Sequence, residues 1–533
     1  MQKHLKICFW ISTILLLIYF TLLLLFGSTT FADALRGYET LFQYNELGIW
    51  NNLSYPADIG SDFHYFVSWW SPGQWLLPYL IIKITGIASF QTIQTIIIIP
   101  SLLICVFGYT LLFKKLGFSS LTRWIAMLCI VSNQLFYWQT LMYYGGDLLL
   151  LALFPFFILL IIEEKKKTIW WYFSFSTVLI LGLLAKNTFV ILIICALIFM
   201  LSRKGIKQTK LKFHIIVSAI STMLIVLFYF LHLKWGETPG SATDTEGYNG
   251  IPNDWLGDLF YSIGSPFGIF SRITFFIQKI AGHIGFINAF QLIPALISIL
   301  FVIYLTKKPV STYQQLIIRF TLPFIGFFCL MFVLNQAVSY EMRHFAPVAF
   351  LFFPGIIDWM LGLKWKKIML FAIYFFCLTD LAWFAYSFKR IESESTLWNT
   401  LKVSKSDAEN LETITKWDNK NSQSLVLIED YWALNIAARK NKKLVVQKDN
   451  LGWKIITGME LDRADYCNLK TTAKLNGYDK ILIISSKKTK NQLANAFRGK
   501  KSILIKSTDE FNFYEVKLDE ASPKPPLPES KQL

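Results

Sequence analysis

Residues 147–204 read DLLLLALFPFFILLIIEEKKKTIWWYFSFSTVLILGLLAKNTFVILIICALIFMLSRK and contain three apolar runs separated by two short polar joints. The first joint is Glu163-Glu164-Lys165-Lys166-Lys167, and the second is Ala185-Lys186-Asn187. A helix that crosses the hydrocarbon core needs roughly 20 apolar residues, and runs of close to this length predict membrane spans. The stretch therefore predicts three consecutive spans rather than the core of a soluble domain.

The same pattern continues over most of the chain. Of the 533 residues, 54% are hydrophobic and only 16% are charged, whereas a soluble domain has roughly 25% charged residues. This composition excludes an ordinary soluble enzyme and a disordered chain. Eleven spans are predicted, at about 7–26, 88–113, 120–140, 147–162, two within 168–202, 213–233, 286–306, 316–335, 344–363 and 367–387. The Pro-broken segment 71–86 is too short to span and is predicted to be interfacial or re-entrant.

The basic residues of the membrane part predict its orientation. The start Met1–Lys6 is basic, and about 20 apolar residues follow it without a small-residue cleavage site, which indicates a retained first helix. With the N-terminus in the cytoplasm, the Lys/Arg-rich joints all fall on the cytoplasmic side, as the positive-inside rule requires. The loops 28–70 and 235–284 and the C-terminal domain then lie outside. We expect an integral protein of the inner or plasma membrane.

A composition change near residue 388 marks a second domain. Of the 87 charged residues, 45 lie from Lys389 onward. Short apolar runs at 424–428, 444–446, 480–484, 502–505 and 511–518 predict strands, and the helical patterns at 431–440 and 489–498 predict a small α/β layer. The predicted organisation is a membrane domain over 1–388, an extracytoplasmic α/β domain over 389–520 and a Pro-rich disordered tail over 521–533.

The net charge of +17 does not indicate a nucleic-acid partner, because the basic residues lie in short membrane loops or alternate with acids. Six of the seven cysteines lie in apolar segments, and Cys467 is alone in the soluble domain, so no disulfide framework is expected. No Cys/His cluster has metal-ligand spacing. The need for a divalent metal such as Mg²⁺ or Mn²⁺ stays open.

The first outer loop carries candidate catalytic acids. Asp33, Arg36 and Glu39 share one predicted helical face just after the first span, and Asp62 and His64 follow later in the loop. A carboxylate at the bilayer surface can act as a general base toward an acceptor hydroxyl. Asp33 is the first candidate for this base and Asp62 the second, with His64 as a substrate-binding candidate. The alternative is a solvated loop in which an Asp caps a helix.

Further candidates for substrate binding lie at predicted outer turns. Asp147 ends the turn Tyr143-Tyr-Gly-Gly-Asp147, where it could also be an N-cap. Lys186 could bind the phosphate of a lipid-linked substrate as a point charge, or extend to the membrane surface. Arg343, in Tyr340-Glu-Met-Arg-His-Phe-Ala-Pro347, offers a planar fork suited to phosphate, and Tyr340 precedes it. Pairing of Arg343 with Glu341 is the alternative.

With these motifs in this order, the chain resembles the GT-C superfamily of membrane glycosyltransferases over about residues 5–390. It is most similar in layout to the aminoarabinose-transferase and protein O-mannosyltransferase group. The resemblance lies in Phe31-Ala-Asp33-Ala-Leu-Arg36, Ser71-Pro-Gly-Gln-Trp-Leu-Leu-Pro78 and Met142-Tyr-Tyr-Gly-Gly-Asp147, together with Gly-Leu-Leu-Ala-Lys186 and Arg343-His-Phe-Ala-Pro347.

The resemblance implies a polytopic α-helical GT-C-like fold, a polyprenyl-phosphate-linked sugar donor and an inverting displacement. The acceptor would be a glycan, a lipid or a protein. Two positions depart from the family pattern. The family often has His or Lys before a Pro-Pro pair where this chain has Ser71-Pro72-Gly73, and its early acidic pair is here Asp33 beside Ala34.

Two other functions remain open alternatives. A transporter or lipid flippase would show inverted repeats and charges near the bilayer midplane, whereas this sequence shows no repeat and places its candidate charges at one face. A polysaccharide polymerase or ligase also has many spans and large outer loops. An assay comparing lipid-linked monosaccharide with lipid-linked oligosaccharide separates it from a monosaccharide transferase.

Overall fold

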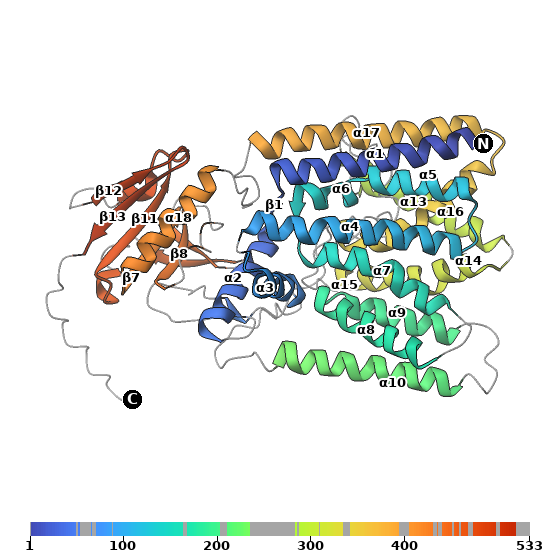
Figure 1. Cartoon of the computed structure of the whole chain (residues 1–533), viewed down its shortest axis with the longest axis horizontal. Coiled ribbons are helices and arrows are strands. Elements are labelled where there is room, and N and C mark those ends of the chain that lie inside the picture. Colours follow the sequence, from blue (N-terminus) through green and yellow to red (C-terminus); the bar gives the residue numbers. More distant parts are fainter. Residues whose placement is uncertain are drawn as a thin grey trace. The chain divides into compact units, whose positions relative to one another are not determined.

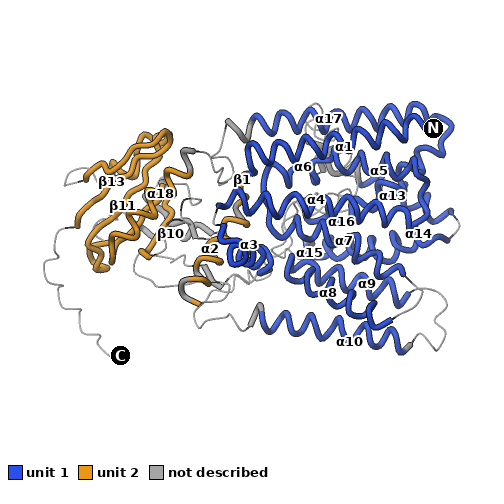
Figure 2. The backbone as a smooth tube through the Cα atoms, in the orientation of Figure 1, with its two compact units in different colours: residues 1–28, 69–235, 244–393 blue, residues 29–68, 236–243, 394–533 orange. Residues whose placement is uncertain are grey.

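The computed structural model describes residues 2–48, 52–53, 65–66, 71–87, 89–163, 168–202, 211–234, 283–284, 287–308, 310–333, 342–393, 405–429, 434, 437, 440–449, 452–457, 460–466, 473–496 and 502–518 (Figure 1). The chain divides into two compact units (Figure 2). Unit 1 comprises residues 1–28, 69–235 and 244–393, and unit 2 comprises 29–68, 236–243 and 394–533. The predicted division counted the loop after the first helix with the membrane part, whereas here this loop groups with the C-terminal residues.

Unit 1 consists of apolar helices. Five described helices are long and apolar enough to cross a membrane, at Gln2–Phe26, Phe90–Lys115, Lys212–Leu231, Thr312–Met331 and Lys366–Lys389. Shorter apolar helices lie at Ser120–Ser132, Gly146–Ile162, Ile169–Ala185, Phe189–Ser202, Ala295–Thr306 and Ala346–Leu361. Each of the eleven predicted spans overlaps one of these helices, and the predicted span 120–140 continues past Ser132 into a second helix. The protein is an integral membrane protein.

Unit 1 contains helices and a few two-residue strands. The helices are α1 (Gln2–Phe26), α3 (Gly73–Thr85), α4 (Phe90–Lys115), α5 (Ser120–Ser132), α6 (Gln134–Leu141), α7 (Gly146–Ile162), α8 (Ile169–Ala185), α9 (Phe189–Ser202), α10 (Leu211–Phe228), η2 (Tyr229–Lys234), α13 (Ala289–Thr306), α14 (Thr312–Leu316), η4 (Ile317–Thr321), α15 (Leu322–Val333), η5 (Met342–Phe345), α16 (Ala346–Leu361) and α17 (Lys366–Ser393). Short strands are β4 (Met142–Tyr143) and the antiparallel pair β5 (His283–Ile284) and β6 (Ile287–Asn288).

Small residues and tyrosines join these helices closely. A Cβ on Gly108 of α4 would lie 2.6 Å from Cγ of Pro155 in α7, so glycine is needed for this approach. The buried hydroxyl of Tyr109 donates to the Pro347 carbonyl at 2.8 Å, which fixes the start of α16 against α4. Such contacts replace the hydrophobic driving force that lipid surroundings remove between membrane helices.

Two helix breaks matter for the site. The helix α3 has 13 residues and ends at Gly86, whose φ is +71°. Figure 1 shows α3 nearly end-on, whereas the long helices of unit 1 run lengthwise across the picture, so α3 lies across the bundle direction, as an interfacial segment would. The predicted span 120–140 is divided into α5 and α6 at Asn133. Its backbone is extended, and its side chain accepts from the Leu135 amide at 2.9 Å, which starts α6 as an N-cap.

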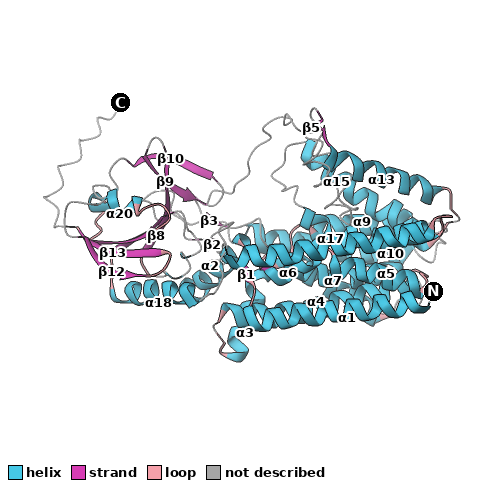
Figure 3. Cartoon of the chain, turned by 90° about the horizontal axis from the view of Figure 1, so that it is seen from above, coloured by secondary structure: helices cyan, strands magenta, loops and turns pink. Residues whose placement is uncertain are grey.

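Unit 2 contains a seven-stranded sheet with the order β10-β9-β8-β7-β11-β13-β12 (Figure 3). Its elements are α18 (Lys405–Lys420), β7 (Ser424–Glu429), β8 (Lys442–Asp449), β9 (Gly452–Thr457), β10 (Glu460–Tyr466), β11 (Lys480–Ser486), α20 (Gln492–Ala496), β12 (Ser502–Ser507) and β13 (Phe511–Lys517). The central strands β8, β7 and β11 are parallel, and the outer pairings are antiparallel. The five predicted strands are confirmed, whereas β9 and β10 were not predicted. Unit 2 also contains β1 (Thr29–Thr30), α2 (Ala32–Leu47) and the antiparallel pair β2 (Asn52–Leu53) and β3 (Tyr65–Phe66).

A buried carboxylate joins two parallel strands of this sheet at their carboxyl ends. Glu429, at the end of β7, is 3% exposed. It accepts hydrogen bonds from the Ser485 hydroxyl, from the Ser486 amide at 3.1 Å and from the Thr489 hydroxyl at 2.7 Å. Three donors satisfy the charge, so this acid holds β7 and β11 together. The predicted helix at 431–440 and the tail at 521–533 fall largely or wholly outside the described residues.

Candidate active site

The joint between α8 and α9 presents Lys186. Lys186 ends α8 with an extended backbone, and the chain turns through Asn187 and Thr188 into α9. The Phe189 amide donates to the Lys186 carbonyl at 2.9 Å. The ring of Phe189 lies directly over Gly182, where any Cβ would collide with it. The turn is therefore tightly closed, and it fixes the backbone from which the lysine side chain leaves.

The start of α7 is placed against this joint. Gly145 has φ +63° and ψ −111°, a conformation that favours glycine. A Cβ on Gly146 would lie 3.2 Å from the Ala185 carbonyl carbon and closer still to its oxygen. The glycine pair thus brings Asp147, in the first turn of α7, beside Lys186. A negative charge in the first turn also interacts favourably with the helix dipole.

Lys186 is held between two side chains. Its Nζ donates to Oδ1 of Asp147 and lies 2.6 Å from Nδ1 of His344. The side chains of Lys186 and Asp147 are 15% and 8% exposed, so this ion pair is largely removed from solvent. An ammonium has no acceptor. While Lys186 is charged, the Nδ1 of His344 can only accept in this contact.

His344 comes from the short helix η5, which is anchored next to it. Phe345 is buried, and its ring centroid lies 4.7 Å from that of Phe328 and 6.1 Å from that of Phe324. These aromatic contacts fix η5 against the η4–α15 helix. The backbone of Arg343 lies in the same turn.

The start of α3 completes the arrangement. The Ser71 hydroxyl donates to Oδ1 of Asn187 at 2.5 Å. A Cβ on Gly73 would lie 2.8 Å from the Leu184 carbonyl carbon and closer to its oxygen. Ser71 and Gly73, the residues that depart from the family pattern, therefore bind the α8–α9 joint directly. The ends of α3, α7, α8 and η5 meet around Lys186.

This geometry changes how Lys186 and Asp147 are interpreted. In the sequence they were two separate candidates for substrate binding. The structure joins them in one ion pair. The Asp147 carboxylate and the His344 imidazole fix the position of the Lys186 ammonium, and an ammonium is a group that forms charge-assisted hydrogen bonds to phosphate.

For two other predicted site residues the structure describes only the backbone. Asp33 lies in the first turn of α2 and Arg343 in η5, but their side chains lie outside the described residues. Asp62, His64 and Tyr340 also lie outside them.

The described residues contain no group of three His, Cys, Asp or Glu suited to a metal. Asp147 and His344 both contact the Lys186 ammonium, so they do not fit a divalent ion at this point.

Three contributors to the site were not predicted as functional residues, namely His344, Asn187 and Gly146. Each is adjacent in sequence to a predicted one, at Arg343, Lys186 and Asp147. The sequence signal that could have identified these three residues is that each lies next to a charged candidate residue at a helix end.

No family model and no curated protein matches the chain. Among solved structures, ArnT from Cupriavidus metallidurans in the apo state is similar with a TM-score of 0.51 and 12% identity, covering 96% of this chain and 98% of that chain. The chain has the fold of this ArnT structure. The predicted fold is thereby confirmed.

Two further structures are similar at lower scores. ArnT from the same organism bound to undecaprenyl phosphate has a TM-score of 0.48 and 12% identity, covering 96% of this chain and 99% of that chain. The archaeal oligosaccharyltransferase AglB from Archaeoglobus fulgidus, in complex with an inhibitory peptide and a dolichol-phosphate, has a TM-score of 0.44 and 10% identity. It covers 94% of this chain and 74% of that chain.

Proposed function

We propose that the protein is a membrane glycosyltransferase that transfers a sugar from a polyprenyl-phosphate-linked donor to an acceptor. The observation that carries this proposal is the Lys186 ammonium, held between Asp147 and His344 where the ends of α3, α7, α8 and η5 meet. The GT-C fold and the family resemblance of the same residues support it.

Lys186 has the role of binding the donor phosphate. When the bond between the sugar and the phosphate oxygen breaks, negative charge develops on the departing lipid phosphate. A fixed cation in a site with little water stabilises that charge more than it stabilises the intact donor. Asp147 and His344 keep the ammonium in place. Arg343, in the same turn as His344, supplies a second cation to the phosphate.

The acceptor is activated by a carboxylate of the outer loop. Its hydroxyl oxygen forms a bond to the anomeric carbon on the face opposite the phosphate. The hydroxyl proton passes to Asp33, and the electrons of the broken bond remain on the phosphate. Asp62 is the second candidate for this base. His64 and Tyr340 are proposed to contact the substrate. We place this site on the extracytoplasmic face, where the acceptor is a glycan, a lipid or a protein.

The test is Lys186→Met in the purified full-length protein, with undecaprenyl phosphate as the binding probe. Each charge-assisted hydrogen bond to phosphate contributes about 1.5–3 kcal/mol, so binding should weaken about ten- to a hundredfold. The matched control is Lys115→Met, which removes an interhelical ion pair with Glu163 whose side chains are 50% and 46% exposed. Normal binding by Lys186→Met contradicts the phosphate role, as does equal loss in both variants.

Turnover is measured with a set of undecaprenyl-phosphate-linked monosaccharides and one lipid-linked oligosaccharide. A monosaccharide transferase releases undecaprenyl phosphate from at least one monosaccharide donor. Release from the oligosaccharide donor alone would favour a polymerase or ligase instead.

A further inference from the structure

Helix α2, which carries Asp33, is tied to the α/β sheet of unit 2 by a buried ion pair. Lys443 Nζ, from β8, donates to Oε1 of Glu39 in α2. The side chains of Lys443 and Glu39 are 3% and 1% exposed. The two residues are about 400 positions apart in sequence and lie in the same compact unit.

The sheet holds Lys443 in one place. Its strand register pairs Lys443 with Val426 of β7, and Val426 with Leu482 of β11. Val426 and Leu482 are fully buried. In this row of the sheet Lys443 therefore stands next to two fully buried apolar residues, where an unpaired ammonium would be costly.

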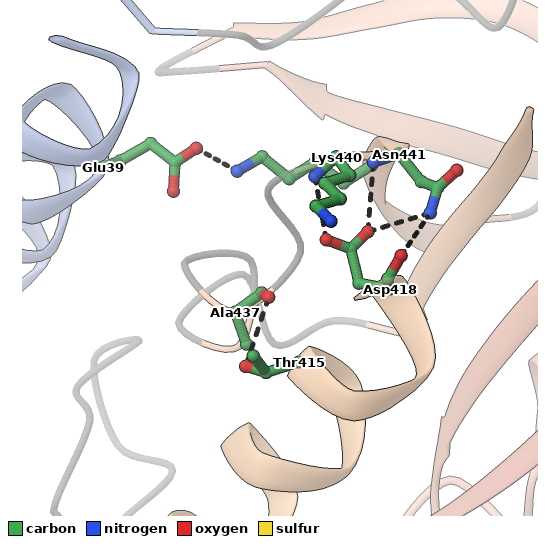
Figure 4. A network of polar contacts seen from close by, with 7 residues as sticks. Glu39, Thr415, Asp418, Ala437, Lys440 and Asn441 are labelled. Atoms are coloured by element: carbon green, nitrogen blue, oxygen red, sulfur yellow. Dashed lines mark hydrogen bonds and ion pairs between the residues drawn. The ribbon is translucent and has the colours of Figure 1, made fainter. Parts of the chain in front are cut away.

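The segment that enters β8 is also fixed. Asp418, at the end of α18, accepts from the Lys440 amide at 2.8 Å and from the Asn441 amide at 3.0 Å (Figure 4). The Asn441 side chain donates to Asp418 Oδ1 at 3.0 Å and accepts from the Ser424 amide, also at 3.0 Å. Figure 4 shows Glu39 directed from its own helix toward this segment. These hydrogen bonds hold the backbone just before Lys443 in a fixed position.

Stability alone does not explain such a pair. Replacing a buried ion pair by apolar side chains is often neutral or stabilising, because desolvation offsets the attraction between the charges. Oε2 of Glu39 has no hydrogen-bond partner among the described residues. The ion pair with Lys443 is therefore what offsets the cost of burying the Glu39 carboxylate. What the pair does supply is a fixed position for α2.

We propose that Lys443 is a positioning residue for Asp33, and that the α/β domain acts in transfer by holding α2. This inference rests on the proposed function, in which Asp33 is the base. Asp33 and Glu39 are six positions apart in the sequence, about 9 Å along the helix axis. Because a helix moves as a stiff rod over this distance, the Glu39–Lys443 contact sets where the start of α2 lies relative to the sheet of unit 2. A misplacement of about 1 Å at a reacting group can reduce the rate about a hundredfold.

The experiment is a double-mutant cycle on turnover in the full-length protein, with Lys443→Met and Asp33→Asn alone and combined. The donor is the undecaprenyl-phosphate-linked monosaccharide that the wild type turns over. Lys443→Met should lower kcat about ten- to a hundredfold and leave the donor KM within about twofold. In the Asp33→Asn background the same change should have little further effect, because the group that it positions is already absent. Lys443→Arg should retain most of the activity.

The matched control is Lys506→Met, which breaks an exposed ion pair with Glu409 in the same unit, and it should turn over normally. A loss in Lys443→Met that is equal in both Asp33 backgrounds would show general destabilisation and overturn the positioning role. Normal turnover of Lys443→Met beside an inactive Asp33→Asn would overturn this inference alone. Normal turnover of Asp33→Asn would instead remove Asp33 as the base, and the proposed mechanism with it.

Discussion

Gly146 tests whether the close approach of α7 to the α8–α9 joint builds the site. In Gly146→Ala, the added Cβ would meet the Ala185 carbonyl, with its carbon at 3.2 Å and its oxygen closer. Both are backbone atoms and cannot rotate away. To reach an ordinary separation of about 3.5 Å from both atoms, the start of α7 must move by roughly 1.5 Å. Asp147 moves with it, away from Lys186.

Two effects follow from this displacement. Overpacking of a well-packed contact costs about 1–3 kcal/mol, so the midpoint of thermal unfolding should fall. A displaced Asp147 also leaves Lys186 without its fixed partner, and we expect undecaprenyl phosphate to bind at least about tenfold more weakly. Turnover should fall further, by about a hundredfold, since transfer requires more exact placement than binding does.

The assay compares Gly146→Ala with Gly326→Ala in α15, where a Cβ would meet nothing within 4 Å. The control adds the same methyl group in open space and should retain stability and lipid binding. If Gly146→Ala binds undecaprenyl phosphate and unfolds as the wild type does, the joint tolerates the methyl group, and the argument that this approach positions Asp147 is refuted.

Three further predictions concern the base, the α/β domain and the topology. Asp33→Asn should fold, bind undecaprenyl phosphate and lose about a hundred- to ten-thousandfold in turnover, whereas loss in Asp62→Asn instead would move the base there. Glu429→Ala leaves three donors without their acceptor and should lower the stability of the α/β domain by about 1–3 kcal/mol, checked by hydrogen exchange; unchanged exchange would contradict it. An impermeant thiol reagent added outside should label Cys467, and labelling from the cytoplasmic side alone would reverse the topology.

Much of the fold follows from the sequence because lipid imposes a simple rule on length and polarity. Each of the eleven predicted apolar segments is helical in its described part, and the strands around Leu425, Leu444 and Ile483 were evident from their apolar runs. The break at Asn133 was missed because an apolar run hides it, and a capping side chain acts through local geometry. The hairpin β9–β10 was missed because its sequence, with Lys454, Asp462 and Arg463 among apolar residues, lacks a simple alternation.

The charged site residues and their gathering at one face of the membrane were predicted, but the pairing of Lys186 with Asp147 was not. Lys186 and Asp147 were identified because charges beside apolar runs are costly. Their pairing depends on how α7 packs against α8, which depends on a glycine contact with a backbone carbonyl. A single sequence does not contain that distance. The Glu39–Lys443 pair was missed for the same reason, since it joins residues about 400 positions apart.

The most direct test of the donor site is the mass of the lipid that remains bound to the purified full-length protein under native conditions. The account predicts a polyprenyl phosphate, with or without its sugar, bound to the wild type and to Lys115→Met and lost from Lys186→Met. Equal retention by all three proteins, or no polyprenyl lipid on any of them after its addition in excess, would contradict the assignment of Lys186 to the donor phosphate.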